Sequence, residues 1–243
     1  MTHPEISAVF FDLDETLIKT TKSFEQLSLE TFDAFASHLA PTTRTQYWEL
    51  FWHKALDTWF MMIDGALPAE HARIYAHINT LRALNGDERL AAPMLEYAEN
   101  LLVASTVLLE DTLPVLTRLR AHRIPLGIIT NGFTQPQRAK LARHGLEPLV
   151  DFIVVSGEVG VHKPNPGIFE HALALAHAAP ERAIYVGDQP EVDIAGAQRA
   201  GLQAVLISGP DPVQDLPRAG TPNPATPRIT RLAELLPLLG LDA

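Results

Sequence analysis

Two aspartates stand directly after an apolar run near the start of the chain. Asp12 and Asp14 follow residues 6–11 in ISAVFFDLDET, and the apolar run is typical of a buried strand. Alternate strand residues point the same way, so both carboxylates can address one bound molecule. Paired carboxylates can attack an electrophile, transfer a proton or hold a cation. An aspartate at a strand end is also a common turn or capping residue, so the pair alone does not define a site.

Polar residues follow three later apolar runs as well. Thr130 ends the segment PLGIIT, and Asn131 begins the turn that follows it. Lys163 comes shortly after the segment DFIVVS. Asp188 ends the segment AIYVGD, and Asp193 follows five residues later. Each of these residues alone has an ordinary explanation as a turn, surface or helix-dipole residue. Parallel sheets bind ligands at the carboxyl ends of their strands. Suitable groups at four strand ends therefore favour a ligand site.

Strands and helices alternate after about residue 110. The expected strands are residues 6–12, 125–130, 151–156, 183–188 and 203–208, and the expected helices are residues 114–122, 135–144, 166–178, 190–200 and 230–239. This alternation predicts an α/β fold, a Rossmann-like parallel sheet with helices on both faces. Residues 208–227 hold six prolines and read as an irregular loop.

The first strand is separated from the others by a stretch of helical periodicity. We expect about four helices there, with starts at Pro68 and Asp87 and a stop at Gly86. Residues 1–17 and 110–243 are therefore assigned to an α/β core domain, and residues 18–109 to an inserted helical domain. Three tryptophans lie in the insert at helical spacing, which predicts a core stripe of its bundle: Trp48, Trp52 and Trp59.

Composition excludes several classes of protein. The chain has no cysteine, which rules out disulfides, cysteine–metal sites and a thiol nucleophile, and fits a reducing, cytoplasmic location. The net charge of −10 disfavours a nucleic-acid partner. We see neither a signal peptide nor an apolar run long enough to cross a membrane. The ten histidines form no metal-binding helix motif and are interpreted as surface residues.

Four segments, in order, carry a family resemblance: DLDET, IITNG, HKPNPGIF and VGDQPEVD. They resemble the four motifs of the haloacid dehalogenase superfamily, and the helical insert resembles the small helical cap of that superfamily. The resemblance covers the whole α/β part. It implies hydrolysis of small phosphorylated metabolites, as phosphate monoesters, through an aspartyl phosphate and with magnesium as cofactor.

The resemblance also implies roles for individual residues. Asp12 corresponds to the nucleophile, and Asp14 to the general acid and base. The magnesium ligands would be Asp12, the backbone carbonyl of Asp14, and Asp188, with Asp193 reaching the metal through water. An acid at position 14 suits an alcohol leaving group, which needs a proton, and disfavours dehalogenation, in which a halide leaves.

Three further residues match the phosphate-binding positions of the superfamily. Thr130, the amide of Asn131 and Lys163 would hold the phosphoryl oxygens, where charge accumulates in the transition state. We expect the helical insert to select among substrates, because the α/β motifs recognise only phosphate.

Two other functions remain open. A sugar-phosphate mutase of the same superfamily shares all four motifs. A phosphoaspartate signalling module also uses carboxylates, a threonine and a lysine on such a sheet, although it has no cap and no need for Asp14. The chain has neither a G-x-G-x-x-G nor a P-loop motif. The physiological substrate and the oligomeric state do not follow from the sequence.

Overall fold

The computed structural model describes residues 6–63, 65–208 and 225–241. The chain divides into two compact units. The α/β unit consists of Met1–Lys19 and Val107–Ala243, and the helical unit of Thr20–Thr106. That the first is a catalytic domain and the second a cap remains a prediction.

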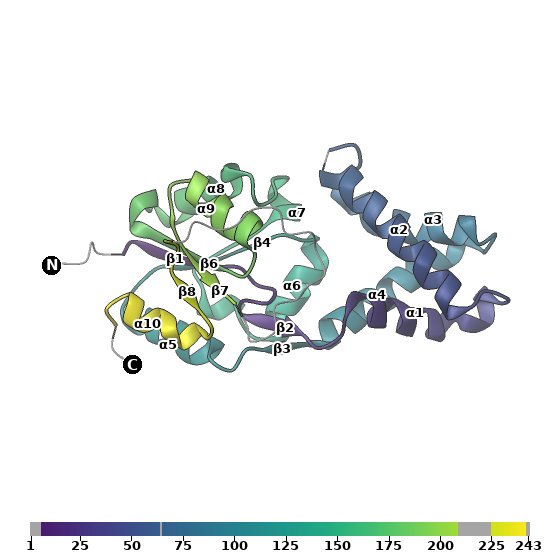
Figure 1. Cartoon of the computed structure of the whole chain (residues 1–243), viewed down its shortest axis with the longest axis horizontal. Coiled ribbons are helices and arrows are strands. Elements are labelled where there is room, and N and C mark those ends of the chain that lie inside the picture. The colour runs from purple at the N-terminus through teal and green to yellow at the C-terminus, as the bar shows by residue number, and fades with distance from the viewer. Residues whose placement is uncertain (1–5, 64, 209–224, 242–243) are drawn as a thin grey trace. The chain divides into compact units, whose positions relative to one another are not determined.

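The α/β unit is built on one six-stranded sheet in the order β5-β4-β1-β6-β7-β8 (Figure 1). Its strands are β1 (Ala8–Phe11), β4 (Leu126–Thr130), β5 (Phe152–Val155), β6 (Ala183–Gly187), β7 (Gln203–Ile207) and β8 (Arg228–Ile229). Every neighbouring pair is parallel. The carboxyl ends of β1, β4 and β6 therefore share one edge, and the predicted α/β fold class is confirmed.

Both faces of this sheet are covered by helices. The helices of the unit are α5 (Thr112–Ala121), α6 (Thr134–Arg143), η2 (Glu147–Leu149), α7 (Ser156–Val159), α8 (Pro166–Ala176), η3 (Pro180–Arg182), η4 (Pro190–Ile194), α9 (Ala195–Arg199), η5 (Leu232–Glu234) and α10 (Leu235–Leu238). In Figure 1, α8 and α9 lie on one side of the sheet, and α5 and α10 on the other.

Strand β1 shows why its sequence is apolar without alternation. Successive strand residues point to opposite faces. Phe10 packs into a core cluster with Phe169 of α8, and Phe11 packs into a second cluster with Leu116 of α5. A strand buried on both faces reads as a continuous apolar run. This packing fixes the position of the residues that follow β1.

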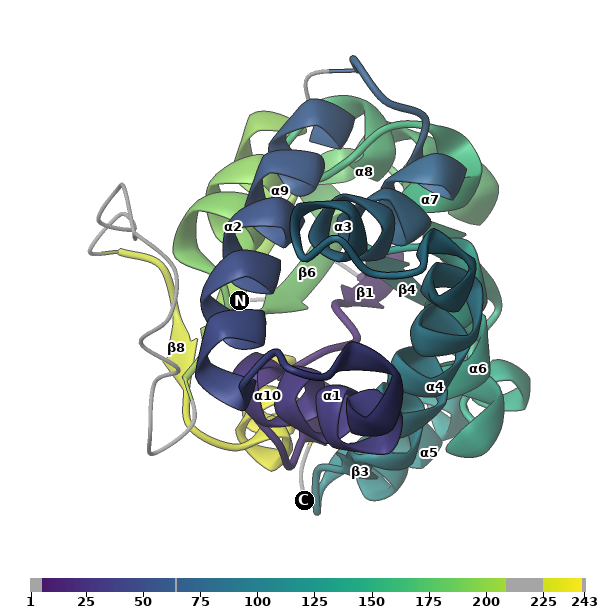
Figure 2. The same ribbon diagram turned by 90° about the vertical axis from the view of Figure 1, so that its right-hand side faces the viewer.

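The helical unit contains four long helices around a core of its own (Figures 1 and 2). They are α1 (Phe24–Leu39), α2 (Arg44–Ile63), α3 (Ala69–Ala83) and α4 (Ala91–Ala104), with the short η1 (Glu88–Leu90) before α4. The predicted starts are confirmed, because Pro68 precedes α3 and the Asp87 side chain accepts a hydrogen bond from the Arg89 N–H. Strands β2 (Ile18–Thr20) and β3 (Thr106–Leu108) pair where the chain enters and leaves this unit.

The core stripe of α2 lies one residue away from the predicted one. Trp48 and Trp52 are half-buried, and their rings pack against the partly exposed Phe24, at centroid distances of 5.9 and 5.8 Å. Tyr47 and Phe51 occupy the core instead, stacked at 5.5 Å. The spacing of four residues was right, but aromatic residues on two adjacent faces of the helix made its phase ambiguous.

One histidine contradicts the prediction of a surface location. His77 is buried in the helical unit with its ring 4.9 Å from that of Phe51. Burial lowers the pKa of His77 to about 4, so the ring is neutral at physiological pH. A neutral imidazole in an apolar core behaves as a packing residue, which sequence alone does not distinguish from a surface residue.

The end of the α/β unit also departs from the sequence prediction. The helix expected over residues 230–239 is present but shorter, as η5 followed by α10, and it is preceded by the unpredicted strand β8. A two-residue strand is too short to give a periodic signal. The expected helix over residues 190–200 is divided into η4, a π-turn, and α9. Of the predicted proline-rich loop, residues 209–224 lie outside the described residues.

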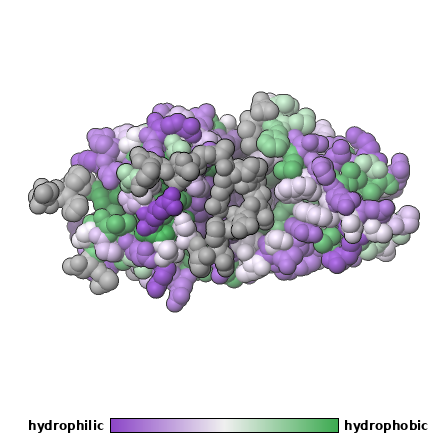
Figure 3. Space-filling model, viewed as in Figure 1, coloured by the Kyte–Doolittle hydropathy of each residue, from purple (hydrophilic) through white to green (hydrophobic). Residues whose placement is uncertain are grey.

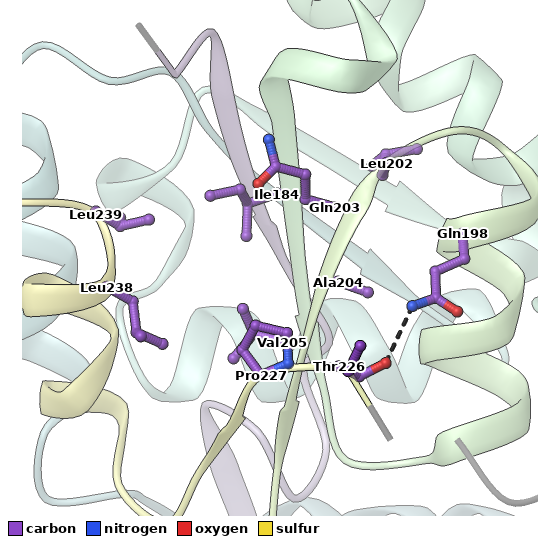
Figure 4. Close-up of a pocket in the computed structure, with 11 residues that line it drawn as sticks. Ile184, Gln198, Leu202, Gln203, Ala204, Val205, Thr226, Pro227, Leu238 and Leu239 are labelled. Carbon is purple, nitrogen blue, oxygen red and sulfur yellow. Dashed lines mark hydrogen bonds between the residues drawn. The ribbon is translucent and has the colours of Figure 1, made fainter. Parts of the chain in front are cut away.

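A pocket of about 310 Å³ is bordered by β6, β7 and α10, and Figure 4 shows the residues that line it. None of the described residues that line the pocket carries an ionisable side chain. Two of the lining residues are joined by a hydrogen bond, which the Gln198 side chain donates to the Thr226 hydroxyl at 3.1 Å. In Figure 3, hydrophilic residues are interspersed with smaller hydrophobic areas on the coloured part of the surface. Within the described residues, no helix is both long and apolar enough to span a membrane.

Gly127 of β4 provides a test of how tightly β4 packs against the Phe10 side chain of the neighbouring strand β1. A Cβ at this position would lie 2.5 Å from Cδ1 of Phe10, closer than real contacts allow. We expect Gly127→Ala to lower the free energy of unfolding by about 1–3 kcal/mol, because the buried ring must move. Urea denaturation followed by circular dichroism measures this.

Gly86→Ala is the matched control. Its Cβ would have no neighbour closer than 3.4 Å, so the variant should unfold close to the wild-type midpoint. If Gly127→Ala unfolded at the same urea concentration as wild type, the tight contact between Gly127 and Phe10 would be contradicted.

Candidate active site

Three carboxylates meet at the carboxyl edge of the sheet. Asp12 follows β1, Asp188 follows β6, and Asp193 lies in η4, and an oxygen of each lies within 4.8 Å of the others. The two strands pair with Phe11 opposite Val186, and the Asp12 N–H donates to the Val186 carbonyl at 2.9 Å. Asp12 and Asp193 are buried. The register of β1 and β6 therefore brings the predicted metal-binding carboxylates of Asp12 and Asp188 together, and η4 adds that of Asp193.

Lys163 places a positive charge within this group. Its Nζ donates hydrogen bonds to Oδ1 of Asp12 and to Oδ1 of Asp193, both at 2.7 Å. Only 2% of the side chain is exposed, so the charge is not that of a surface lysine. We call Asp12, Asp188, Asp193 and Lys163 the acid–lysine cluster.

Asn131 holds the backbone of Lys163 in place. Its Nδ2 donates to the Lys163 carbonyl at 2.9 Å, and its Oδ1 accepts the Lys163 N–H at 2.8 Å. These two hydrogen bonds join the end of β4 to the segment before α8. The structure therefore gives the Asn131 side chain a positioning contact, which sequence reasoning did not foresee.

The charges of the acid–lysine cluster do not balance within the protein. Burial raises the pKa of Asp12 to about 7 and that of Asp188 to about 8, and the neighbouring carboxylates add to both shifts. Burial alone would lower the pKa of Lys163, but the carboxylates of Asp12 and Asp193 outweigh it and raise the pKa. Lys163 supplies one positive charge against three carboxylates, so a further cation would stabilise the ionised site.

Asp188 supports the assignment of a cation site here. Its Oδ1 is buried and has no hydrogen-bond partner among the described residues. A buried acceptor without a donor is costly unless something else occupies its lone pairs. Clustered carboxylate oxygens are the ligands that Mg²⁺ prefers. Asp12, Asp188 and Asp193 therefore fit a magnesium ion.

Tyr185 and Gly187 of β6 shape the cluster, and sequence reasoning missed both. The Tyr185 hydroxyl lies 2.8 Å from Nζ of Lys163 and 3.1 Å from Oδ1 of Asp193. A Cβ at Gly187 would lie 2.5 Å from Cγ of Asp193, so only glycine leaves room for that carboxylate. In the sequence, the glycine directly before Asp188 was the one sign that a side chain packs closely against this strand end.

The remaining predicted residues, Asp14 and Thr130, lie against α6. Lys140 Nζ contacts both carboxylate oxygens of Asp14, at 2.8 and 3.0 Å. Gln137 Nε2 donates to Oδ2 of Asp14 at 2.8 Å and to the Thr130 hydroxyl at 2.6 Å. Sequence reasoning missed Gln137 and Lys140, although two buried polar residues three positions apart share one helix face.

A parallel α/β sheet with buried acids and a lysine at its carboxyl edge is the architecture of an enzyme that acts on a ligand there. The chain belongs to the haloacid dehalogenase-like hydrolases, whose family pattern matches residues 6–201. The expected resemblance is thereby confirmed, and the chain is a hydrolase of this family.

Relatives and solved structures agree with this assignment. The chain is 30% identical over 207 residues to a glyceraldehyde 3-phosphate phosphatase of Methanothermobacter thermautotrophicus, covering 84% of this chain and 86% of the relative. It is 32% identical over 205 residues to the phosphatase of that name from Methanopyrus kandleri, covering 83% and 84%. A 2-haloacid dehalogenase of Pseudomonas syringae has a similar fold, with a TM-score of 0.71, 25% identity and coverage of 97% and 98%.

The charge imbalance of the cluster predicts how stability depends on pH without metal. The pKa values of Asp12 and Asp188 are about 7 and about 8 in the folded protein, against an ordinary value of 3.8. As the pH rises from about 4, the unfolded chain releases protons that the folded protein retains. In EDTA, stability should fall toward pH 8 by up to about 1.4 kcal/mol per pH unit for each group. Urea denaturation across this range measures the slope.

Two variants isolate the contribution of the cluster. Asp188→Asn removes one of the two carboxyls, so its stability should fall less steeply toward pH 8. Magnesium should stabilise the wild type at pH 8 more than this variant. Asp57→Asn removes an exposed carboxylate and should keep the wild-type slope. Identical slopes for Asp188→Asn and wild type would contradict the charge imbalance.

Proposed function

We propose that this hydrolase is a magnesium-dependent phosphatase of small phosphorylated metabolites, acting through an aspartyl phosphate on Asp12. The observation that carries the proposal is the contact of the buried Asp12 with Lys163 at 2.7 Å, next to two further carboxylates. A carboxylate nucleophile must be ionised, and an adjacent ammonium favours that form. Two relatives named as phosphatases, matched over most of their length, support the same class of reaction.

In the first step, a carboxylate oxygen of Asp12 attacks phosphorus, and the bond from phosphorus to the substrate oxygen breaks. Asp14 gives a proton to that oxygen, so an alcohol leaves. In the second step, water attacks the phosphoryl group and gives a proton to Asp14. The acyl–phosphate bond breaks, which releases phosphate and restores both aspartates. One carboxylate thus carries the phosphoryl group while the other carries the proton.

The phosphoryl oxygens need donors, because negative charge spreads over them in the transition state. We assign this role to the Thr130 hydroxyl, the backbone amide N–H of Asn131 and the Lys163 ammonium. Lys163 supplies charge, and Thr130 lies at the end of β4 beside the same edge of the sheet. The loss of one such donor should slow the reaction without abolishing it.

The cofactor of the proposed reaction is magnesium. The carboxylates of Asp12, Asp188 and Asp193 would hold it, together with the backbone carbonyl of Asp14. When bound, it would offset the repulsion between these carboxylates and the phosphate. The unpartnered Oδ1 of Asp188 supports this assignment.

We assign the choice of substrate to the helical unit. It has a core of its own and is joined to the α/β unit beside the β2–β3 pair, so it can differ among related enzymes without altering the sheet. The proposed site in the α/β unit recognises phosphate, which is common to all phosphate monoesters. Selection of the leaving group must then come from other residues.

Asp14 helps to separate this proposal from related reactions. A halide leaves without a proton, so dehalogenation gives an acid at this position no task. A signalling module would be phosphorylated once and would turn over slowly or not at all. A sugar-phosphate mutase would return the phosphoryl group to a second sugar hydroxyl, so phosphate would not accumulate. Continuous release of inorganic phosphate therefore distinguishes the phosphatase from all three.

The first prediction concerns the nucleophile. Wild-type protein should hydrolyse p-nitrophenyl phosphate over many turnovers, and Asp12→Asn should abolish turnover, because an amide does not form the acyl phosphate. Steady-state release of phosphate measures this, and thermal melting shows whether each variant is folded.

Thr130→Ala is the matched control for Asp12→Asn. It removes one hydrogen bond to a charged group, worth about 1.5–3 kcal/mol, so the rate should fall about ten- to a hundredfold. Substantial residual activity in pure Asp12→Asn protein would rule out the covalent mechanism. Equal loss in both variants would mean that the nucleophile is wrongly assigned.

Metal removal provides a second prediction. EDTA should stop turnover, magnesium should restore it, and calcium should do so poorly, because its larger and more flexible coordination disturbs an in-line attack. Asp188→Ala should raise the magnesium concentration needed for half-maximal rate. Full activity of EDTA-treated protein in metal-free buffer would rule out the proposed cofactor.

A further inference from the structure

Helix α6 presents two buried donors to Asp14. Lys140 and Gln137 are 5% and 3% exposed, and they lie three residues apart on one face of the helix. We propose that Lys140 and Gln137 are positioning residues that hold the Asp14 carboxyl group for both proton transfers. This inference rests on the proposed function, since it concerns the acid and base of that reaction. We call Lys140, Gln137 and Asp14 the Asp14 clamp.

The first part of the clamp is the ion pair. Lys140 Nζ lies 2.8 Å from Oδ1 and 3.0 Å from Oδ2 of Asp14, so it contacts both oxygens and limits rotation of the carboxyl group. A buried ammonium that loses its partner is strongly destabilising, so Lys140 resists release of Asp14. Leu141, the next residue of α6, is fully buried in a core cluster of the sheet and anchors the helix.

The second part is Gln137, which connects Asp14 to Thr130. A side-chain amide carries two N–H donors. One can donate to Oδ2 of Asp14 at 2.8 Å and the other to the Thr130 hydroxyl at 2.6 Å. The proton-transferring carboxyl and a proposed phosphate-binding hydroxyl are thus held by one nitrogen. Their separation is set by the protein before any substrate arrives.

Gln137 also determines which way the Thr130 proton points. Because the Thr130 oxygen accepts from Gln137, its own O–H must donate elsewhere. The acceptor in the structure is the Asn131 carbonyl at 3.4 Å, a long hydrogen bond that a phosphoryl oxygen can replace. The clamp therefore prepares Thr130 as a donor to phosphate.

Gly132 is what allows Gln137 to reach this place. A Cβ at position 132 would lie 2.9 Å from Cγ and Cδ of Gln137, and the backbone there has φ +151°, which side chains rarely adopt. The glycine of the Thr-Asn-Gly turn is therefore explained by the clamp. The sequence predicted a turn at this strand end and assigned no role to its glycine.

The clamp suits both proton transfers. Lys140 and Gln137 only donate through these nitrogens, and Asp14 keeps an acceptor oxygen whether or not it carries a proton. The contacts can therefore persist while Asp14 protonates the leaving group and then takes a proton from water. A carboxyl group that returns to one orientation serves both steps.

The test compares two leaving groups. Phenyl phosphate and p-nitrophenyl phosphate have similar shapes, but phenolate needs a proton more than nitrophenolate does. In Lys140→Met, kcat/KM for phenyl phosphate should fall at least tenfold more than kcat/KM for p-nitrophenyl phosphate. Hydrolysis of the common aspartyl phosphate still needs Asp14, so kcat should fall for both. A burst of nitrophenolate close to the enzyme concentration should therefore precede the slow steady state.

Three further variants accompany this measurement. Arg138 lies on the same helix, but its partly exposed side chain pairs with Glu158 of α7 and not with Asp14, so Arg138→Met should behave as wild type. Lys140→Arg keeps the charge and should recover most of the phenyl phosphate rate. Gln137→Leu should also raise KM for both substrates, because Thr130 is no longer oriented. If Lys140→Met fails to fold, Lys140→Gln and Gln137→Leu decide the question by the same comparison.

The outcomes separate the two proposals. An equal loss of kcat/KM for both aryl phosphates, or no loss for either, would overturn the positioning role while leaving the phosphatase intact. If wild-type protein, with magnesium, turned over neither substrate, the proposed function itself would fail. The greater loss for phenyl phosphate, its recovery in Lys140→Arg and the burst together would establish the Asp14 clamp.

Discussion

The buried contact of one ammonium with two carboxylates is the interaction on which the rest of the site depends. Lys163 reaches Asp12 after β1 and Asp193 in η4, so it ties together segments that are distant in the chain. Such a group is stable only when each charge has a partner and the backbone holds the partners in place. Asn131 supplies that support for Lys163, and Gly187 leaves space for Asp193. The identities of these five residues are therefore linked.

A second arrangement of charge lies beside the first and is built differently. Asp14 follows Asp12 by two residues, yet its partners come from α6 and not from the strand ends. The two aspartates thus have separate surroundings, one tied to Lys163 and the other to Lys140. Different surroundings are what allow two chemically identical groups to act in different roles.

The sequence predicted the parts of this protein that depend on short-range pattern. The fully apolar strands, the alternation with helices and the residues at the strand ends all follow from burial and from the geometry of parallel sheets. Tyr185, Gln137 and Lys140 were missed because their contacts depend on which face of a strand or helix meets the site. Those faces are set by tertiary packing, and the same uncertainty moved the core stripe of α2 from the tryptophans to Tyr47 and Phe51. Strand β8 was missed because two residues carry no period.

The pairing of β2 with β3 has a consequence for the order in which the sheet assembles. Strand β1, which Asp12 follows, ends at Phe11, whereas its neighbour β4 begins only at Leu126. Strand β1 can therefore pair only with strands that lie far along the chain. The helices between them form contacts that are closer in sequence and can associate sooner. Once they do, the hydrogen bond from the Thr21 N–H to the Ser105 carbonyl at 2.8 Å brings the two ends of the insert together. The helical unit then shortens the effective loop that closure of the sheet must span.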